Sequence, residues 1–215
     1  MKLLETAGYD GRELRLVLHG DAEHAAVVLP GRAGAGNRVG GSPARPDLHL
    51  ARALLQEQGL AVLEVWWDAD EIPDGEREPW LLGNARAAVG ILDEEGRRAA
   101  LLVGRSLGSL ALALLRHEEP ELARLPSVWI APLVHLEPVR ASLLRDGGPR
   151  FVLWGDRDEA YDAGLATLLH RRGADVLVLE RANHGLDVGD APATARALAE
   201  ALEQLRHFVR RAVPS

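Results

Sequence analysis

Residues 99–115 read AALLVGRSLGSLALALL, an apolar strand pattern followed by a tight turn and a small-residue helix pattern. The turn is the pentapeptide Gly104-Arg105-Ser106-Leu107-Gly108. A serine between a strand and a helix in such a turn is held in a strained backbone conformation that presents its hydroxyl group. Ser106 is therefore a candidate nucleophile, although the pentapeptide alone would also suit a plain glycine-rich turn.

Strand and helix patterns alternate on both sides of this turn. The predicted strands are 13–18, 25–29, 61–67, 99–103, 128–131, 151–154 and 176–179. The last five are nearly continuous apolar runs, which indicates that helices cover both faces of the sheet. Apolar stripes at 50–55, 81–92 and 198–209 predict helices, the last of them on the outside. The pattern predicts an α/β fold, a three-layer doubly wound sheet that is mostly parallel.

The N-terminal edge of this sheet should differ from the rest. Gly20-Asp21 separates the first two predicted strands and is typical of a hairpin turn. We therefore expect the N-terminal edge of the sheet, at the strands 13–18 and 25–29, to be antiparallel.

Composition narrows the class of protein. The 215 residues are 47% hydrophobic, enough for a single domain spanning 1–215. A formal charge of -7, with Lys2 as the only lysine, argues against a nucleic-acid partner. The sequence has no cysteine, which excludes disulfides, thiolate metal ligands and a cysteine nucleophile. The N-terminal residues lack a signal-like apolar run, and no run is long enough to span a membrane, so we expect a cytoplasmic protein without a membrane partner. Its oligomeric state stays open.

Polar residues follow several of the predicted strands, where ligands bind in parallel sheets. A serine, two acids and a histidine come in that order along the chain, after a glycine-rich segment. These residues are Gly31, Arg32, Ser106, Asp156, Asp158 and His184.

Three motifs together resemble the α/β-hydrolase superfamily over about residues 16–209. They are Gly104-Arg105-Ser106-Leu107-Gly108, Gly155-Asp156-Arg157-Asp158 and Asn183-His184-Gly185. The resemblance implies the α/β-hydrolase fold and a serine hydrolase that needs no metal and no cofactor. Only residues 135–150 lie between the fifth and sixth predicted strands, so the chain is similar to members without a cap domain.

The resemblance also implies catalytic roles. Ser106 would attack an acyl carbonyl, His184 would accept the serine proton, and Asp158 would orient the imidazole. Asp158 is favoured over Asp156 because the family acid is the last residue of a Gly-x-x-Asp turn, and Asp162 and Asp187 are expected to be bystanders.

Two backbone N–H groups should bind the developing oxyanion, those of Leu107 and Arg32. The family often has His-Gly-x where this chain has Pro30-Gly31-Arg32, a change that keeps the glycine and the amide after it. The glycines at 31–41 would also suit a flexible loop.

The residues after the strands are candidates for the substrate cleft: Gly31, Trp67, Asp68, Arg105, Leu133 and His135. Strand alternation points Trp66 and Trp67 to opposite faces, and the choice between them, or the packing of both under helices, stays open. Arg32 and Arg105 suit either a substrate carboxylate or surface ion pairs.

The expected function is hydrolysis of small or medium acyl esters or thioesters, small-molecule substrates, through an acyl-enzyme. Amide cleavage and acyl transfer stay open because the same triad serves them. The alternatives are a non-catalytic binding or scaffold protein with this fold, and a perhydrolase that uses the same triad.

Overall fold

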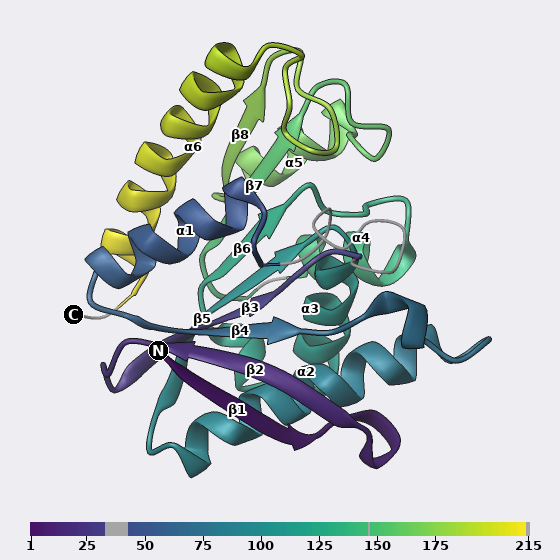
Figure 1. The fold of residues 1–215 in the computed structure, drawn as a ribbon. Coiled ribbons are helices and arrows are strands. Elements are labelled where there is room, and N and C mark those ends of the chain that lie inside the picture. The colour runs from purple at the N-terminus through teal and green to yellow at the C-terminus, as the bar shows by residue number, and fades with distance from the viewer. Residues whose placement is uncertain (33–42, 146, 214–215) are drawn as a thin grey trace.

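The computed structural model describes residues 1–32, 43–145 and 147–213, and Figure 1 shows the fold. The strands are β1 (Lys2–Ala7), β2 (Glu13–His19), β3 (His24–Leu29), β4 (Ala61–Trp66), β5 (Arg98–Arg105), β6 (Ser127–Ile130), β7 (Arg150–Gly155) and β8 (Asp175–Leu179). The α-helices are α1 (Pro46–Glu57), α2 (Arg77–Glu94), α3 (Leu107–Glu118), α4 (Glu137–Leu144), α5 (Ala163–Arg171) and α6 (Ala191–Ala212).

The strands form one twisted sheet in the order β1-β2-β4-β3-β5-β6-β7-β8. All neighbouring pairs from β4 to β8 are parallel, whereas β2 pairs antiparallel with both β1 and β4. The predicted mostly parallel α/β sheet is therefore confirmed.

Helices cover both faces of the sheet, as Figure 1 shows. One apolar core lies under α1 and α6 and includes Leu54, Phe151 and Phe208. The other lies under α2, α3, α4 and α5 and includes Leu81, Leu110 and Leu169. Nearly every residue of α3 is buried, while α6 buries one stripe, as the two sequence patterns predict.

The N-terminal edge of the sheet is antiparallel, as expected, but the hairpin-like turn at Gly20-Asp21 does not pair 13–18 with 25–29. Strand β4 lies between β2 and β3, and the antiparallel hairpin partner of β2 is β1, which sequence reasoning missed. Leu4 is the only buried residue of β1, while Leu3 is exposed, so the strand has almost no apolar periodicity to detect. The short helix α5 was missed as well.

The connection between β6 and β7 is as short as the sequence predicts. Its described residues hold one helix, α4, and no further helix or strand. The carboxyl ends of the central strands are therefore left without a covering cap built from this connection.

Candidate active site

Ser106 forms the turn between β5 and α3, with φ 49° and ψ −115°. Residues with side chains rarely adopt a positive φ, and such strain persists only where surrounding contacts hold it. Here the Ser106 N–H donates to the Ile130 carbonyl over 3.0 Å. The Ser106 carbonyl in turn accepts from the Ser109 hydroxyl over 2.6 Å. The predicted strand, turn and helix around the serine are all present.

Two glycines let α3 approach the sheet behind this turn. A Cβ atom on Gly108 would lie 2.0 Å from the Leu29 carbonyl oxygen, and one on Gly104 would lie 2.7 Å from the Gly108 carbonyl oxygen. Both distances are impossible contacts for carbon, so any larger residue would push the helix away from β3 and β5. The glycines of the pentapeptide thus fix the position of Ser106 through close packing.

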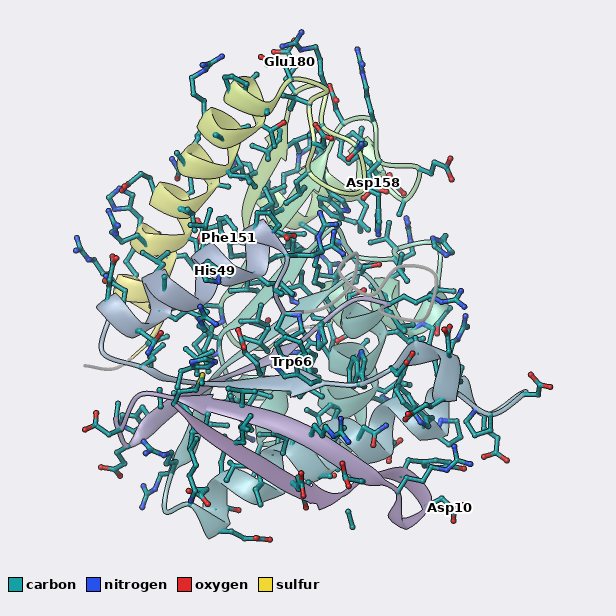
Figure 2. The ribbon with its side chains drawn as sticks, in the orientation of Figure 1. Asp10, His49, Trp66, Phe151, Asp158 and Glu180 are labelled. Atoms are coloured by element: carbon teal, nitrogen blue, oxygen red, sulfur yellow. The ribbon has the colours of Figure 1, made fainter. Side chains whose placement is uncertain are left out.

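The structure brings together the serine, histidine and acid that the sequence singled out. His184 Nε2 lies 2.8 Å from Ser106 Oγ, and His184 Nδ1 lies 2.8 Å from Asp158 Oδ2. The three residues follow β5, β7 and β8, at the carboxyl ends of parallel strands. Figure 2 shows Asp158 beyond the end of β7, away from Phe151 near the start of that strand. The imidazole is therefore placed to accept the Ser106 proton at Nε2 while Asp158 orients it through Nδ1.

The Asp158 carboxylate is held in its ionised form. Its side chain is only 1% exposed, and burial alone raises the pKa of a carboxyl group. Hydrogen bonds from His184 and from the Ala160 N–H, together with the charge of Arg105, outweigh burial and leave the pKa of Asp158 lowered. An ionised acid at this position favours the tautomer of His184 in which Nδ1 carries the proton and Nε2 accepts one.

The competing acids lie elsewhere. Asp156 is exposed. Asp162 caps the N-terminus of α5 and pairs with Arg140. Asp187 accepts hydrogen bonds from Gly189 and Thr194. Among these carboxylates, the structure places only Asp158 against the imidazole.

The predicted oxyanion donors flank the serine. Gly31 passes close to Ser106, since a Cβ atom on Gly31 would lie 3.2 Å from Ser106 Cβ. The Trp67 indole N–H donates to the Gly31 carbonyl over 3.2 Å. In a trans peptide the carbonyl and the next N–H point in opposite directions, so the Arg32 N–H points away from Trp67. Within the described part of the chain, neither this N–H nor that of Leu107 donates a hydrogen bond.

Trp67, one of the cleft candidates, does not line the cleft. Its side chain lies in the core at 5% exposure, 5.6 Å from the Trp80 ring of α2, and supports the Gly31 peptide from below. Trp66, labelled in Figure 2, is the last residue of β4 and is 40% exposed. Its partner in the neighbouring strand β2 is Arg15. Of the two tryptophans, one therefore packs under a helix and the other meets solvent.

The expected place of Arg105 in the cleft is wrong too. Its side chain is 3% exposed and forms an ion pair with Asp47, with 2.7 Å between Nε and Oδ2. The neighbouring Arg32 side chain is exposed and lies 3.6 Å from Asp70. Asp68 accepts a hydrogen bond from the Asp70 N–H and so caps the short 3₁₀ turn at Ala69–Glu71. Sequence reasoning missed Asp47 because it lies far from Arg105 in the chain, with no motif around it.

An open cleft with a volume of about 910 Å³ lies beside the acid and the histidine. Leu133 and His135, two of the cleft candidates, line it, and charged and polar side chains complete its wall. These further residues are Arg45, Arg157, Glu159, Asn183 and Asp187. The cleft therefore offers both apolar and polar contacts to a bound molecule.

The described residues contain no group of three or more histidine and acidic side chains arranged to hold a metal ion. No helix in the described part of the chain is both long and apolar enough to cross a membrane.

Comparison with solved structures finds similar folds over almost the whole chain. A lidless α/β serine hydrolase from Xanthomonas campestris matches with a TM-score of 0.74 at 17% identity, covering 100% of this chain and 95% of that one. An esterase from Pyrococcus furiosus matches with a TM-score of 0.72 at 15% identity, covering 99% and 93%. A hyperthermophilic esterase from the archaeon Pyrobaculum calidifontis has a TM-score of 0.67 at 19% identity, covering 99% and 86%.

No protein-family model and no curated protein matches the sequence. The structural likeness nevertheless shows the fold plainly: the chain has the α/β-hydrolase fold, without a cap between β6 and β7.

The packing of α3 predicts opposite results for two helical glycines. Gly108→Ala should unfold the protein or cost at least several kcal/mol, because its Cβ would overlap the Leu29 carbonyl. Gly90→Ala, in α2, meets no atom within 4 Å and should stabilise by up to about 1 kcal/mol through helix propensity. Urea unfolding of both variants measures the difference, and equal stabilities would contradict the described contact between α3 and β3.

Proposed function

We propose that this protein is a serine hydrolase that cleaves carboxylic ester or thioester bonds of small or medium acyl groups. The observation that carries the proposal is the hydrogen-bonded series from Ser106 through His184 to the buried carboxylate of Asp158. Its fold is shared by solved esterases and serine hydrolases, which agrees with this chemistry.

In the first half of the reaction, His184 Nε2 accepts the hydroxyl proton while Ser106 Oγ attacks the acyl carbonyl carbon. The imidazolium that forms is stabilised by the Asp158 carboxylate at Nδ1. His184 then donates the proton to the leaving alcohol or thiol as the tetrahedral intermediate collapses to an acyl-enzyme. A water molecule that loses its proton to His184 releases the acid and restores Ser106.

Negative charge develops on the carbonyl oxygen in both halves. The N–H groups of Arg32 and Leu107, which have no acceptor in the described part of the chain, would bind it. The Leu107 amide lies at the N-terminus of α3, where the helix dipole adds to the attraction for an anion.

The cleft suits substrates of modest size with a polar part. The described connection between β6 and β7 places one helix near the site, so acyl and leaving groups can extend toward solvent. Leu133 offers apolar contact, while Arg157 and Glu159 offer charge.

The proposal is tested by labelling with an alkyl fluorophosphonate, which reacts only where a nucleophile, a base and an oxyanion site act together. We expect one adduct, on Ser106, that disappears in Ser106→Ala and nearly disappears in His184→Ala. Peptide mass spectrometry locates the adduct, with denatured protein as control. A folded protein that resists labelling would favour a binding or scaffold role, and peroxide-dependent oxidation that is abolished by labelling Ser106 would favour a perhydrolase.

The two acids of the Gly155–Asp158 turn should differ in their effect on catalysis. Asp158→Asn should lower kcat by about 10⁴-fold, as in the comparable triad, because the wrong tautomer of His184 would face the serine. Asp156→Asn is the matched control, two residues away and exposed, and should retain most activity. Steady-state kinetics on an activated ester decides between them, and a larger loss in Asp156→Asn would refute the assignment.

The acid side of the pH–rate profile should show a single ionisation down to about pH 4. The pKa of Asp158 is lowered from 3.8, so this carboxyl gains a proton only below that pH and adds no second ionisation above it. A plot of log kcat/KM against pH should therefore have unit slope between about pH 4 and 5.5. Circular dichroism at each pH checks that the protein stays folded. A slope of two in this range would mean that a second essential group takes up a proton there.

A further inference from the structure

A buried charge network lies directly beneath the loop that carries His184. Its centre is Asp47, the second residue of α1, whose side chain is 4% exposed. Asp47 Oδ2 lies 2.7 Å from Arg105 Nε, and Asp47 Oδ1 lies 3.1 Å from Arg45 Nε. One carboxylate thus joins two guanidinium groups, each through a different oxygen.

Each guanidinium then holds one carbonyl of the histidine loop. Arg105 Nη2 donates to the His184 carbonyl over 3.3 Å, and Arg45 Nη2 donates to the Gly185 carbonyl over 2.7 Å. The network therefore links α1 and the end of β5 to two successive peptides of the loop. The loop carries the candidate base His184, and Arg105, the residue before Ser106, donates one of the hydrogen bonds that hold this loop.

Arg105 also contacts the opposite side of the site. Its Nη1 lies 3.0 Å from the position that a Cβ atom on Gly31 would occupy. The same side chain thus packs between the loop with the Arg32 N–H and the loop with His184. A Cβ atom on Gly31 would press on the guanidinium, which would have to shift by a few tenths of an ångström.

Stability alone is a weak reason for such a network. Burial lowers the pKa of Arg105 even though Asp47 favours its charged form, which shows how strongly the site desolvates the guanidinium. A buried ion pair is often no more stabilising than apolar side chains of the same volume. What apolar side chains could not do is donate to the carbonyls of His184 and Gly185.

We infer that Asp47, Arg45 and Arg105 are positioning residues that hold the His184 imidazole in register with Ser106 and Asp158. The inference rests on the proposed function. A displacement of about 1 Å can cost about 10²-fold in rate when it lies between reacting groups. Because the network acts on the backbone of the loop, its loss should reduce kcat. Arg45 also lines the cleft, so a change in KM does not bear on the positioning role.

The chain offers a closely matched pair of variants, Arg45→Met and Arg52→Met. Both arginines belong to the α1 region, both side chains are 20% exposed, and both pair with a buried carboxylate, Asp47 or Glu64. Arg52 Nη2 also lies 2.9 Å from the Nδ1 of His49, which Figure 2 labels, and within the described residues it donates to no carbonyl of the histidine loop. The two substitutions remove equal charge and volume, so they separate positioning from a general effect on stability.

We expect Arg45→Met to lower kcat between about 10-fold and 100-fold. Arg52→Met should have the kcat of the wild type, even if it loses as much thermal stability as Arg45→Met. Arg45→Lys keeps a donor for the Gly185 carbonyl and should recover part of the lost kcat. If Arg45→Met does not fold, Arg45→Lys replaces it, and its kcat should lie above about one per cent of the wild-type value but clearly below that value. Equal losses of kcat in Arg45→Met and Arg52→Met, or an unchanged kcat in Arg45→Met, would overturn the inference.

A second readout does not depend on hydrolysis. The proton shared by His184 Nδ1 and Asp158 should give a low-field proton resonance that broadens or vanishes in Arg45→Met and persists in Arg52→Met. If the wild type hydrolysed no acyl substrate, the proposed function would fail, while this resonance would still decide the positioning role. A resonance unchanged in Arg45→Met would overturn the positioning role.

Discussion

The close approach of α3 to β3 and β5 is the contact on which the candidate site depends. Gly108 allows the helix to begin almost against the Leu29 carbonyl, and the chain can make this contact only through the strained turn at Ser106. Strain of this kind costs about 1–3 kcal/mol, and the buried apolar residues of α3 offset it. The packing of α3 against β3 and β5 thus fixes the position of the serine hydroxyl.

Charges buried beneath the site connect its separate loops. Asp158 holds the imidazole from one side, while the Asp47 network holds the backbone of the same loop from below. Arg105 also contributes to the lowered pKa of Asp158, so the two groups are electrostatically linked. Three loops that follow different strands are therefore fixed against one another by a few interactions in a low-dielectric interior, where such interactions are strong.

Prediction from the sequence succeeded where one local pattern carried the information, and failed where a partner was distant. The strand, turn and helix around Ser106 were predictable because the apolar periods and glycines are contiguous. The pairing of β2 was not predictable. Its partner β1 buries few residues, and its other partner, β4, lies much later in the chain. The sequence correctly places Trp67 and Arg105 at the carboxyl edge of the sheet, but both side chains are buried and neither lines the cleft.

The sequence by itself therefore determined the α/β class, the order of the central elements, and the three side chains that meet at the carboxyl edge of the sheet. It could do so because alternation and periodicity are local properties, and because parallel strands bring their carboxyl ends to one edge. Only the tertiary structure decided where each tryptophan points and that Asp47 pairs with Arg105. These outcomes depend on burial and on contacts between residues distant in the chain, which no local pattern records.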